Sequence, residues 1–429
     1  MLTLKLIENK PEEVVARLAV KGFDAARLID EITMLNDKRK NIQAELDGLL
    51  AEQNRMAKEA GVEIGRLKKE GRMDEAESIK LQTAEKTNDL REKSKGLESE
   101  AKTSEQKLHE SLVLMPNLPH ESVPRGRTAE DNFMVRSGGI IPPKSGKLPH
   151  WDLAARYDII DFELGNKLTG AGFPVYKGKG AKLQRALVSF FLDHNIEAGY
   201  LEVQPPYMVN EDSAFGTGQL PDKEGQMYHA TADNLYLIPT AEVPVTNILR
   251  DCILQNSDLP VKLTAYTPCF RREAGSYGKD VRGLNRLHQF DKVEIVQVRK
   301  PEESYQALDE MVAHVEKLIN KLGLPYRIMR LCGGDMSFAS ALTYDFEVYS
   351  AAQERWLEVS SVSNFESFQA NRLKLRYRSE NKKTELLHTL NGSSLALPRI
   401  LAALLENNQT ENSIIIPETL QTYTGFSSI

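Results

Sequence analysis

The chain has 429 residues, of which 41% are hydrophobic and 27% charged, so it is long enough for two or three globular domains. Its formal net charge of −6 argues against a general polyanion binder; DNA is not an expected partner, and any nucleic-acid contact must be local. No run of about 18 apolar residues and no apolar leader core occurs, so neither a membrane span nor a secretory signal is expected. Three widely spaced cysteines without a CxxC pair favour a reducing cytoplasm.

The first quarter of the sequence has the heptad pattern of a coiled coil. Leu28, Leu35, Ile42, Leu49 and Met56 follow one another at intervals of seven, and a second, partly polar series lies four residues after each of the first four. A looser series covers 76–108, and the intervening stretch contains glycines that permit a chain reversal. The pattern predicts an antiparallel hairpin of two helices, each of about 35 residues and roughly 50 Å long.

Two interpretations of this hairpin stay open. A dimerising or scaffolding coiled coil is the ordinary one, but the seam is short and interrupted by polar residues, which is poor for strong self-association. The predicted tip carries more basic than acidic residues, and such an excess suits phosphate groups. The basic residues of the tip are Arg66, Lys68, Lys69 and Arg72.

Prolines divide the chain after this hairpin. Three of them between residues 114 and 126 end the second helix, so we expect one domain over 1–114 and another over 115–429. A Pro/Gly-rich loop follows at 138–149. The later elements expected in chain order are helices over 151–168 and 183–197, a strand with a double proline over 200–209, a loop over 216–230, a strand and helix over 235–249, a helix over 302–322, strands over 343–349 and 355–362, and a strand, tight turn and helix over 388–409.

Residues 267–298 predict two antiparallel strands joined by a long, glycine-bearing loop with a mobile tip. Strand alternation places Val293 and Ile295 toward a core. The opposite face receives Cys269, Arg271, Glu273, His288, Phe290, Lys292 and Glu294. A solvated face with one Arg–Glu ion pair is the ordinary interpretation. Phe290 among the polar residues favours a ligand face, because guanidinium suits phosphate, carboxylate suits an ammonium or amide donor, and a ring suits a purine.

The segment FRREAGSYGKDVRGLNRLHQFDKVE, residues 270–294, resembles the second signature motif of class II aminoacyl-tRNA synthetases, and specifically of bacterial-type seryl-tRNA synthetases. The expected helix over 183–197, followed by the strand over 200–209, resembles the first motif. Residues 388–409 resemble the third, where Pro398 stands in place of a residue that is often glycine in the family. The resemblance covers essentially the whole chain. It implies an α+β fold, with an antiparallel catalytic sheet flanked by helices and an N-terminal helical arm that grips the variable arm of tRNA.

The resemblance also implies an activity. L-Serine and ATP would give seryl-adenylate and diphosphate, and serine would then pass to tRNA(Ser) and, where present, to tRNA(Sec). The implied protein is a cytoplasmic homodimer that uses Mg²⁺. Two rivals stay open, namely a homologue that aminoacylates a carrier protein and a non-catalytic binding module. The sequence lacks GxxxxGK[ST] and a strand-bound GxGxxG, so neither a P-loop nor a dinucleotide fold is supported.

The resemblance finally implies site residues. The expected serine-binding residues are Thr240, Ala241, Glu242, Arg271, Glu294 and Ser393. The expected ATP-binding residues are Arg271, Arg272, Glu273, Phe290, Glu358, Val359, Ser360, Ser361 and Arg399. Arg271 and Arg399 are the expected catalytic residues, and Glu358 and Ser361 supply the oxygen ligands that Mg²⁺ prefers. The expected tRNA-binding residues are Arg66, Lys68, Lys69 and Arg72.

Overall fold

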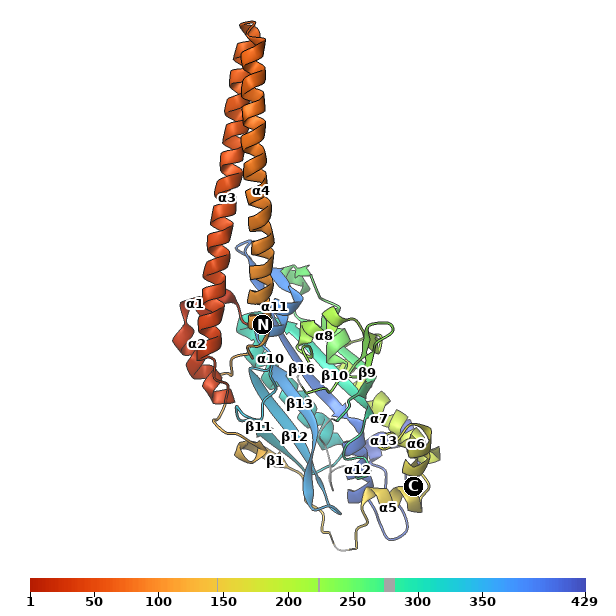
Figure 1. Ribbon diagram of the computed structural model, residues 1–429. Coiled ribbons are helices and arrows are strands. Elements are labelled where there is room, and N and C mark those ends of the chain that lie inside the picture. Colours follow the sequence, from red (N-terminus) through yellow and green to blue (C-terminus); the bar gives the residue numbers. More distant parts are fainter. Residues whose placement is uncertain (145, 223, 274–281) are drawn as a thin grey trace. The chain divides into compact units, whose positions relative to one another are not determined.

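The computed structural model describes residues 1–144, 146–222, 224–273 and 282–429. They form two compact units (Figure 1). The arm unit comprises Leu4–Val15 and Asp24–Met115, and the sheet unit comprises Met1–Thr3, Ala16–Phe23 and Pro116–Ile429. The expected tip of the 267–298 hairpin, with Gly275 and Gly278, lies outside the described residues.

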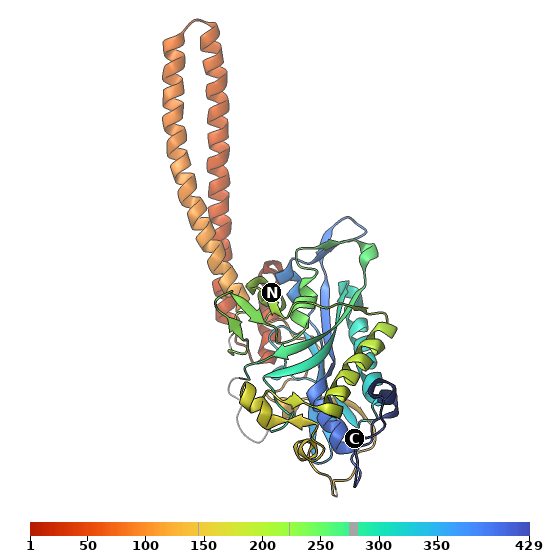
Figure 2. The same cartoon turned by 90° about the vertical axis from the view of Figure 1, so that its right-hand side faces the viewer.

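The arm unit is built on two long helices, α3 (Ala26–Lys69, 44 residues) and α4 (Met73–Val113, 41 residues). They run side by side along their length (Figure 2). Ile32 and Ile42 of the predicted seam are buried, which confirms the helical pair. The short helix α1 (Leu4–Asn9) joins the unit, where the Asn36 amide of α3 donates a hydrogen bond of 2.5 Å to Glu8 Oε1.

The reversal between these helices is tighter than the sequence pattern predicts. Gly61 and Gly65 lie inside α3, and only Gly71, at a φ of 75°, occupies the turn. A glycine inside a helix costs only about 1 kcal/mol, which many good helix formers around it offset. A left-handed turn residue, in contrast, strongly favours glycine. Both helices are therefore longer than expected.

The sheet unit is organised around an eight-stranded sheet. All neighbouring strands in it are antiparallel except the parallel pair at one edge, β4 with β9. In spatial order the strands are β1 (Phe133–Gly138), β11 (Tyr326–Arg330), β12 (Leu342–Ser350), β13 (Arg355–Asn364), β16 (His388–Ala396), β10 (Gln289–Arg299), β9 (Val261–Phe270) and β4 (Leu201–Glu202). The predicted antiparallel sheet with flanking helices is confirmed.

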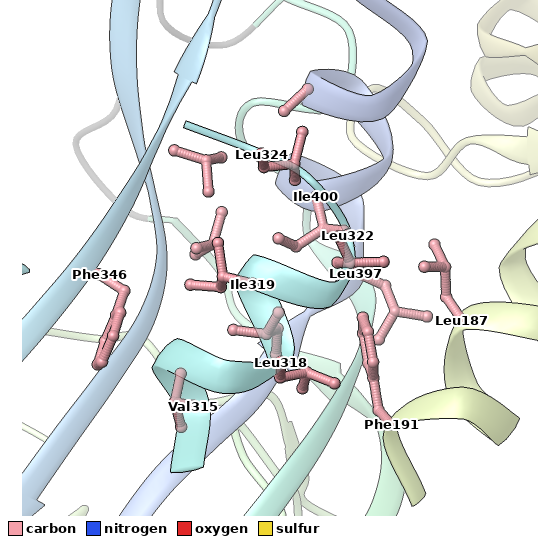
Figure 3. Close-up of a cluster of buried hydrophobic side chains, with 14 of the residues drawn as sticks. Leu187, Phe191, Val315, Leu318, Ile319, Leu322, Leu324, Phe346, Leu397 and Ile400 are labelled. Atoms are coloured by element: carbon pink, nitrogen blue, oxygen red, sulfur yellow. The ribbon is translucent and has the colours of Figure 1, made fainter. Parts of the chain in front are cut away.

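Three helices pack against this sheet to form the main core, α7 (Gly178–Glu197), α10 (Ser304–Lys321) and α12 (Leu397–Asn407). Figure 3 shows side chains of all three helices in one buried cluster, with Phe346 of β12 at the left edge of the view. Val293 and Ile295 belong to the same core and are fully buried, as the alternation predicted. Because one sheet face is covered in this way, polar residues of the strands are left for the other face.

Shorter elements complete the sheet unit. Its small sheets pair β2 (Ile160–Asp161) with β3 (Val175–Tyr176), join β5 (Met208–Val209), β7 (Leu235–Leu237) and β6 (His229–Ala230), and join β15 (Thr384–Leu386), β14 (Arg376–Arg378) and β8 (Ile253–Leu254). Its other helices are α5 (His150–Arg156), α6 (Phe162–Leu168), α8 (Glu211–Thr217), α9 (Glu242–Asn247), α11 (Ser367–Leu373) and α13 (Glu418–Thr424), while α2 (Pro11–Leu18) spans residues of both units.

The expected helix over 151–168 is wrong. The chain forms α5 and α6 instead, separated by Asp158 at a φ of 50° and by β2, whose Ile160 is buried in the core. Helix α7 begins at Gly178, five residues before the expected start. A Cβ at Gly180 would lie 2.2 Å from the Ile159 carbonyl oxygen, so this glycine permits a close approach that no other residue would.

Two further expectations need correction. Residues 200–209 form two short strands in different sheets, interrupted by Pro205 and Pro206, because proline cannot donate a ladder hydrogen bond. Gly392 and its neighbours lie inside β16, and α12 follows at once with Pro398 in its first turn. The elements expected over 235–249, 302–322, 343–349 and 355–362 are confirmed as β7 with α9, α10, β12 and β13.

Candidate active site

A cavity of about 670 Å³ opens beside strands β10, β13 and β16 of the sheet unit. Connecting segments from several parts of the unit complete its lining, including residues 217–222, 224, 226–227, 284–287 and 337–339. Most of the expected serine and ATP residues line it. These are Thr240, Glu242, Arg271, Glu273, Phe290, Glu294, Glu358, Val359, Ser360, Ser361, Ser393 and Arg399.

The hairpin of β9 and β10 brings its two polar faces together. Phe290 pairs with Cys269, and Glu294 pairs with Ala265. Residues directly opposite in a ladder point to the same side of the sheet. Phe290, Lys292 and Glu294 therefore line the cavity in one row, as strand alternation predicted.

A β-bulge in β13 decides which of its residues share a face. Glu347 pairs with Glu358 and Phe346 with Ser360, so Val359 is the extra residue. Plain alternation would put Glu358 and Ser361 on opposite faces; the inserted residue puts them on the same one.

The buried end of the cavity holds two carboxylates and a lysine. The Lys292 ammonium lies 2.7 Å from Glu294 Oε2 and donates a hydrogen bond of 2.7 Å to Thr240 Oγ1. The Gln369 amide donates a bond of 2.6 Å to Glu242 Oε1. Burial, and then the nearby Glu294 carboxylate, raise the pKa of Glu242 to about 7. Such a group of acceptors suits a ligand with an ammonium and a hydroxyl.

The other end of the cavity is cationic and aromatic. The Arg271 guanidinium lies 5.3 Å from the Phe290 ring centroid, and its Nε donates to the Pro239 carbonyl at 3.3 Å. Arg399 donates from Nε to the Asn285 carbonyl at 2.9 Å and from Nη1 to the Glu358 carbonyl at 2.8 Å. Two fixed guanidinium groups on one ring-bearing surface suit phosphates next to a base.

Glu273 lies where β9 has ended, at a φ of 50°, and it pairs with Arg286. Both residues line the cavity. The carboxylate is thus held by a cation of the segment that returns to β10.

Two expected site residues do not line the cavity. Ala241 is fully buried under the first turn of α9 and packs against Val245 and Val296. Arg272 is exposed, and its backbone N–H donates to the Gln226 carbonyl at 2.8 Å. That Ala241 and Arg272 contact the substrates stays a prediction.

The cavity also contains residues that the sequence interpretation did not assign to a site. The sequence did point to Lys292, because strand alternation places it on the same face as Phe290 and Glu294. Asn285, Asn391 and the loop 337–339 had none, since tertiary contacts alone bring them there.

Metal-binding clusters, membrane-spanning helices and disulfide bonds do not occur within the described part of the chain. It contains no cluster of three or more His, Cys, Asp or Glu side chains arranged to hold a metal ion. Among its helices, none has the length and apolar composition needed to cross a membrane. Its three cysteines are free thiols.

Comparisons with known families agree with this geometry. Residues 227–408 match the model of the tRNA synthetase class II core domain (G, H, P, S and T). Residues 1–119 match the model of the seryl-tRNA synthetase N-terminal domain. The antiparallel sheet and the core match define a class II aminoacyl-tRNA synthetase.

Full-length relatives narrow the assignment. The serine–tRNA ligase of Salinibacter ruber is 51% identical over 432 residues, covering 100% of this chain and 99% of the relative. That of Methylacidiphilum infernorum is 46% identical, covering 99% of each. The crystal structure of seryl-tRNA synthetase from Pyrococcus horikoshii complexed with ATP has a TM-score of 0.90 at 34% identity, covering 100% of this chain and 99% of that one. The chain belongs to the seryl-tRNA synthetase family, which confirms the expected family.

Proposed function

We propose that the cavity binds serine at its buried end and ATP at its cationic end, and joins them as seryl-adenylate. The protein is an ATP-dependent serine–tRNA ligase by its family. One observation carries the assignment of the site. Acceptors for an ammonium and a hydroxyl lie at one end, and two arginines beside an aromatic ring lie at the other.

Serine is held by its three polar groups. Its ammonium lies beside Thr240 and binds the Glu242 carboxylate, and its hydroxyl donates to Glu294 beside Ser393. The Ser393 hydroxyl lies 3.4 Å from Glu294 Oε2, which keeps both within reach of one small side chain. Alanine would leave the buried Glu294 without its donor, a larger penalty than a missing methylene. Threonine would need room for an extra methyl.

Arg271 lies between the two substrates. Its guanidinium bridges the serine carboxylate and the α-phosphate, while the adenine ring stacks on Phe290 and its amino group meets Glu273. A serine carboxylate oxygen attacks the α-phosphorus, the bond to the bridging oxygen breaks, and diphosphate leaves with that electron pair. No side-chain base is needed, so positioning and charge stabilisation suffice.

Arg399 contacts the terminal phosphates of ATP. Its guanidinium is held by two backbone carbonyls and lies 3.7 Å from Glu358 Oε2. Its direction is therefore set before ATP binds. Val359, Ser360 and Arg272 complete the expected ATP contacts.

Glu358 and Ser361 fit a magnesium ion. They share a face of β13, and Asp345 lies directly opposite Ser361 with a buried Oδ1 that has no hydrogen-bond partner among the described residues. This all-oxygen set is what Mg²⁺ prefers. When bound, the ion supplies positive charge to the ATP phosphates. The chain's own part is to present these oxygens beside Arg399.

In the second step a ribose hydroxyl at the tRNA 3′ end attacks the carbonyl carbon of the adenylate, and AMP leaves. We assign residues 1–114 to the arm that binds tRNA(Ser), and tRNA(Sec) where present, and residues 115–429 to catalysis. The match of residues 1–119 to the seryl-tRNA synthetase N-terminal domain supports this over a carrier-protein substrate.

The enzyme acts as a homodimer through the segment that resembles the first class II motif. Leu201 is 65% exposed, and Tyr207 and Met208 are exposed as well, although all three are large and apolar. The family implies that a neighbouring copy covers this segment, and several exposed large apolar side chains in one short segment are in keeping with an interface. The free cysteines accord with a cytoplasmic location.

Amino-acid-dependent exchange of ATP with labelled pyrophosphate tests the proposal. Serine should support exchange in the presence of Mg²⁺, and chelation of the metal should stop it. Exchange with glycine, proline or threonine but not with serine would overturn the assignment of the cavity. Charging of tRNA, measured in parallel, separates this function from transfer to a carrier protein.

A further inference from the structure

Lys292 is a buried cation at the end of the cavity where the proposed substrate group is itself a cation, so it does not neutralise a substrate charge there. It is 6% exposed and lies at the end of the cavity that must admit the serine ammonium. A lysine next to that ammonium would by itself repel it. Its presence therefore requires another physical reason.

The first reason is the charge of the buried end. Glu242 and Glu294 are the carboxylates there and Lys292 is the lysine, all three less than one-tenth exposed. With both carboxylates ionised, this set has a charge of −1, and one substrate ammonium brings it to zero. Without Lys292, the two buried carboxylates would face each other with no cation beside them.

The second reason is the direction of Glu294. Lys292, Ser393 and Thr240 all contact its Oε2, at 2.7, 3.4 and 3.5 Å. Among the described residues, none is recorded in hydrogen-bond contact with Oε1. This oxygen is therefore the one presented to a substrate hydroxyl.

The third reason is the contact with Thr240. Lys292 donates to Thr240 Oγ1, which also accepts from the Glu242 N–H at 3.3 Å. Lys292 thus links the start of α9 to β10, although Thr240 and Glu294 are 54 residues apart. The ammonium site and the hydroxyl site are held in one arrangement.

We infer that Lys292 is a specificity-determining positioning residue, which holds Oε2 of Glu294 and leaves Oε1 of that carboxylate turned toward the substrate side chain. The inference rests on the proposed serine site. A carboxylate fixed in this direction makes a better-aligned hydrogen bond to the serine hydroxyl than one that is free to rotate. Left unpaired by alanine, it also carries a larger penalty. Lys292 therefore increases the preference for serine over alanine.

Pyrophosphate exchange with serine and with alanine, in the wild type and in Lys292→Met, tests the inference. The serine kcat/KM should fall by about a hundredfold and the serine-to-alanine ratio by about tenfold or more, while the KM for ATP changes little. Lys262→Met is the matched control, because Lys262 on β9 donates to the Ala198 carbonyl outside the cavity. The serine-to-alanine ratio of kcat/KM in Lys262→Met should equal that of the wild type.

A double variant keeps the test decisive if Lys292→Met folds poorly. Glu294→Gln removes the carboxylate, so adding Lys292→Met to it should cost little further selectivity, and the double variant keeps the net charge of the set at −1, as in the wild type. Equal losses for serine and alanine, or additive effects in the double variant, would overturn the inference. A wild type inactive with serine would instead reject the serine site itself.

Discussion

The backbone N–H of Leu284 donates a hydrogen bond of 2.8 Å to Nε2 of His150, and both residues are buried. Since an N–H can only donate, Nε2 accepts and the ring proton lies on Nδ1, which donates to Glu406 Oε1 at 2.7 Å. Gly283 allows this contact, because a Cβ there would lie 2.2 Å from Nε2. The segment 283–285 is thereby held where the Asn285 carbonyl accepts from Arg399.

His150→Phe should weaken ATP binding more than serine binding. The variant keeps a ring but loses both hydrogen bonds, so Leu284 and the neighbouring Asn285 carbonyl are free to shift and Arg399 loses its fixed direction. We expect the KM for ATP in pyrophosphate exchange to rise about tenfold and the free energy of unfolding to fall by about 2–4 kcal/mol.

Glu406→Gln is the control for this variant, because an amide oxygen can still accept from His150. It should lie close to the wild type in the KM for ATP. Equal increases in the KM for ATP and for serine in His150→Phe would show a general loosening of the fold.

Arg271→Ala should remove adenylate formation and leave the fold intact. Its recorded contacts are weak, a 3.3 Å bond to a carbonyl and a ring 5.3 Å away, so little stability depends on it. Loss of a cation at the reacting phosphate should lower kcat/KM by about 10²–10³-fold. Single-turnover adenylate formation measures this, with thermal unfolding as the check on the fold. Arg376→Ala on β14 is a control outside the cavity, and a loss of only a few-fold in Arg271→Ala would place that residue outside the chemistry.

Glu242 should make both stability and serine binding depend on pH. Its pKa is raised from 4.5 to about 7, so between these values the folded protein holds a proton that the unfolded chain has released. The free energy of unfolding of the ligand-free protein should therefore fall as pH rises from about 4.5 to about 7, and Glu242→Gln should lack this contribution. The serine ammonium favours the ionised form, so the KM for serine should fall between about pH 6 and 8.

Denaturant unfolding and pyrophosphate exchange across this range provide the two measurements. Glu242→Gln should raise the KM for serine and flatten its pH dependence. A variant with the wild-type pH profile would show that another group titrates there.

The two lysines at the arm tip should contribute more to tRNA binding than the two arginines. Arg66 is paired with Glu63 and Glu70, and Arg72 with Glu70 and Glu75, whereas no ion pair is recorded for Lys68 or Lys69 among the described residues. Replacing both lysines by alanine should lower the salt dependence of binding by about 2 if each meets one phosphate.

Filter binding of tRNA at several salt concentrations measures this slope. The paired variant Arg66→Ala with Arg72→Ala should change it less, and both should retain the serine-dependent exchange rate of the wild type. If neither pair changes tRNA binding, the tip is not the tRNA-reading surface, and the scaffolding interpretation of the coiled coil becomes the better one.

Local periodicity in the sequence was enough to predict the helical arm and the β9–β10 hairpin. A spacing of seven identifies a helical seam with Ile32 and Ile42, and alternation puts Phe290 and Glu294 on one strand face, because both patterns follow from backbone geometry alone. The predicted ends of helices and strands were less accurate where glycines occur, since only the packed structure decides which glycine lies in a turn and which lies inside a helix or strand.

Contacts between distant segments were decided only by the tertiary structure. The bulge at Val359 puts Glu358 and Ser361 on one face of the strand, whereas alternation alone would put them on opposite faces. The contact of Lys292 with Thr240 and that of His150 with Leu284 join segments 52 and 134 residues apart. No periodic pattern carries such information, because it depends on how buried polar groups find partners once the core has brought the segments together.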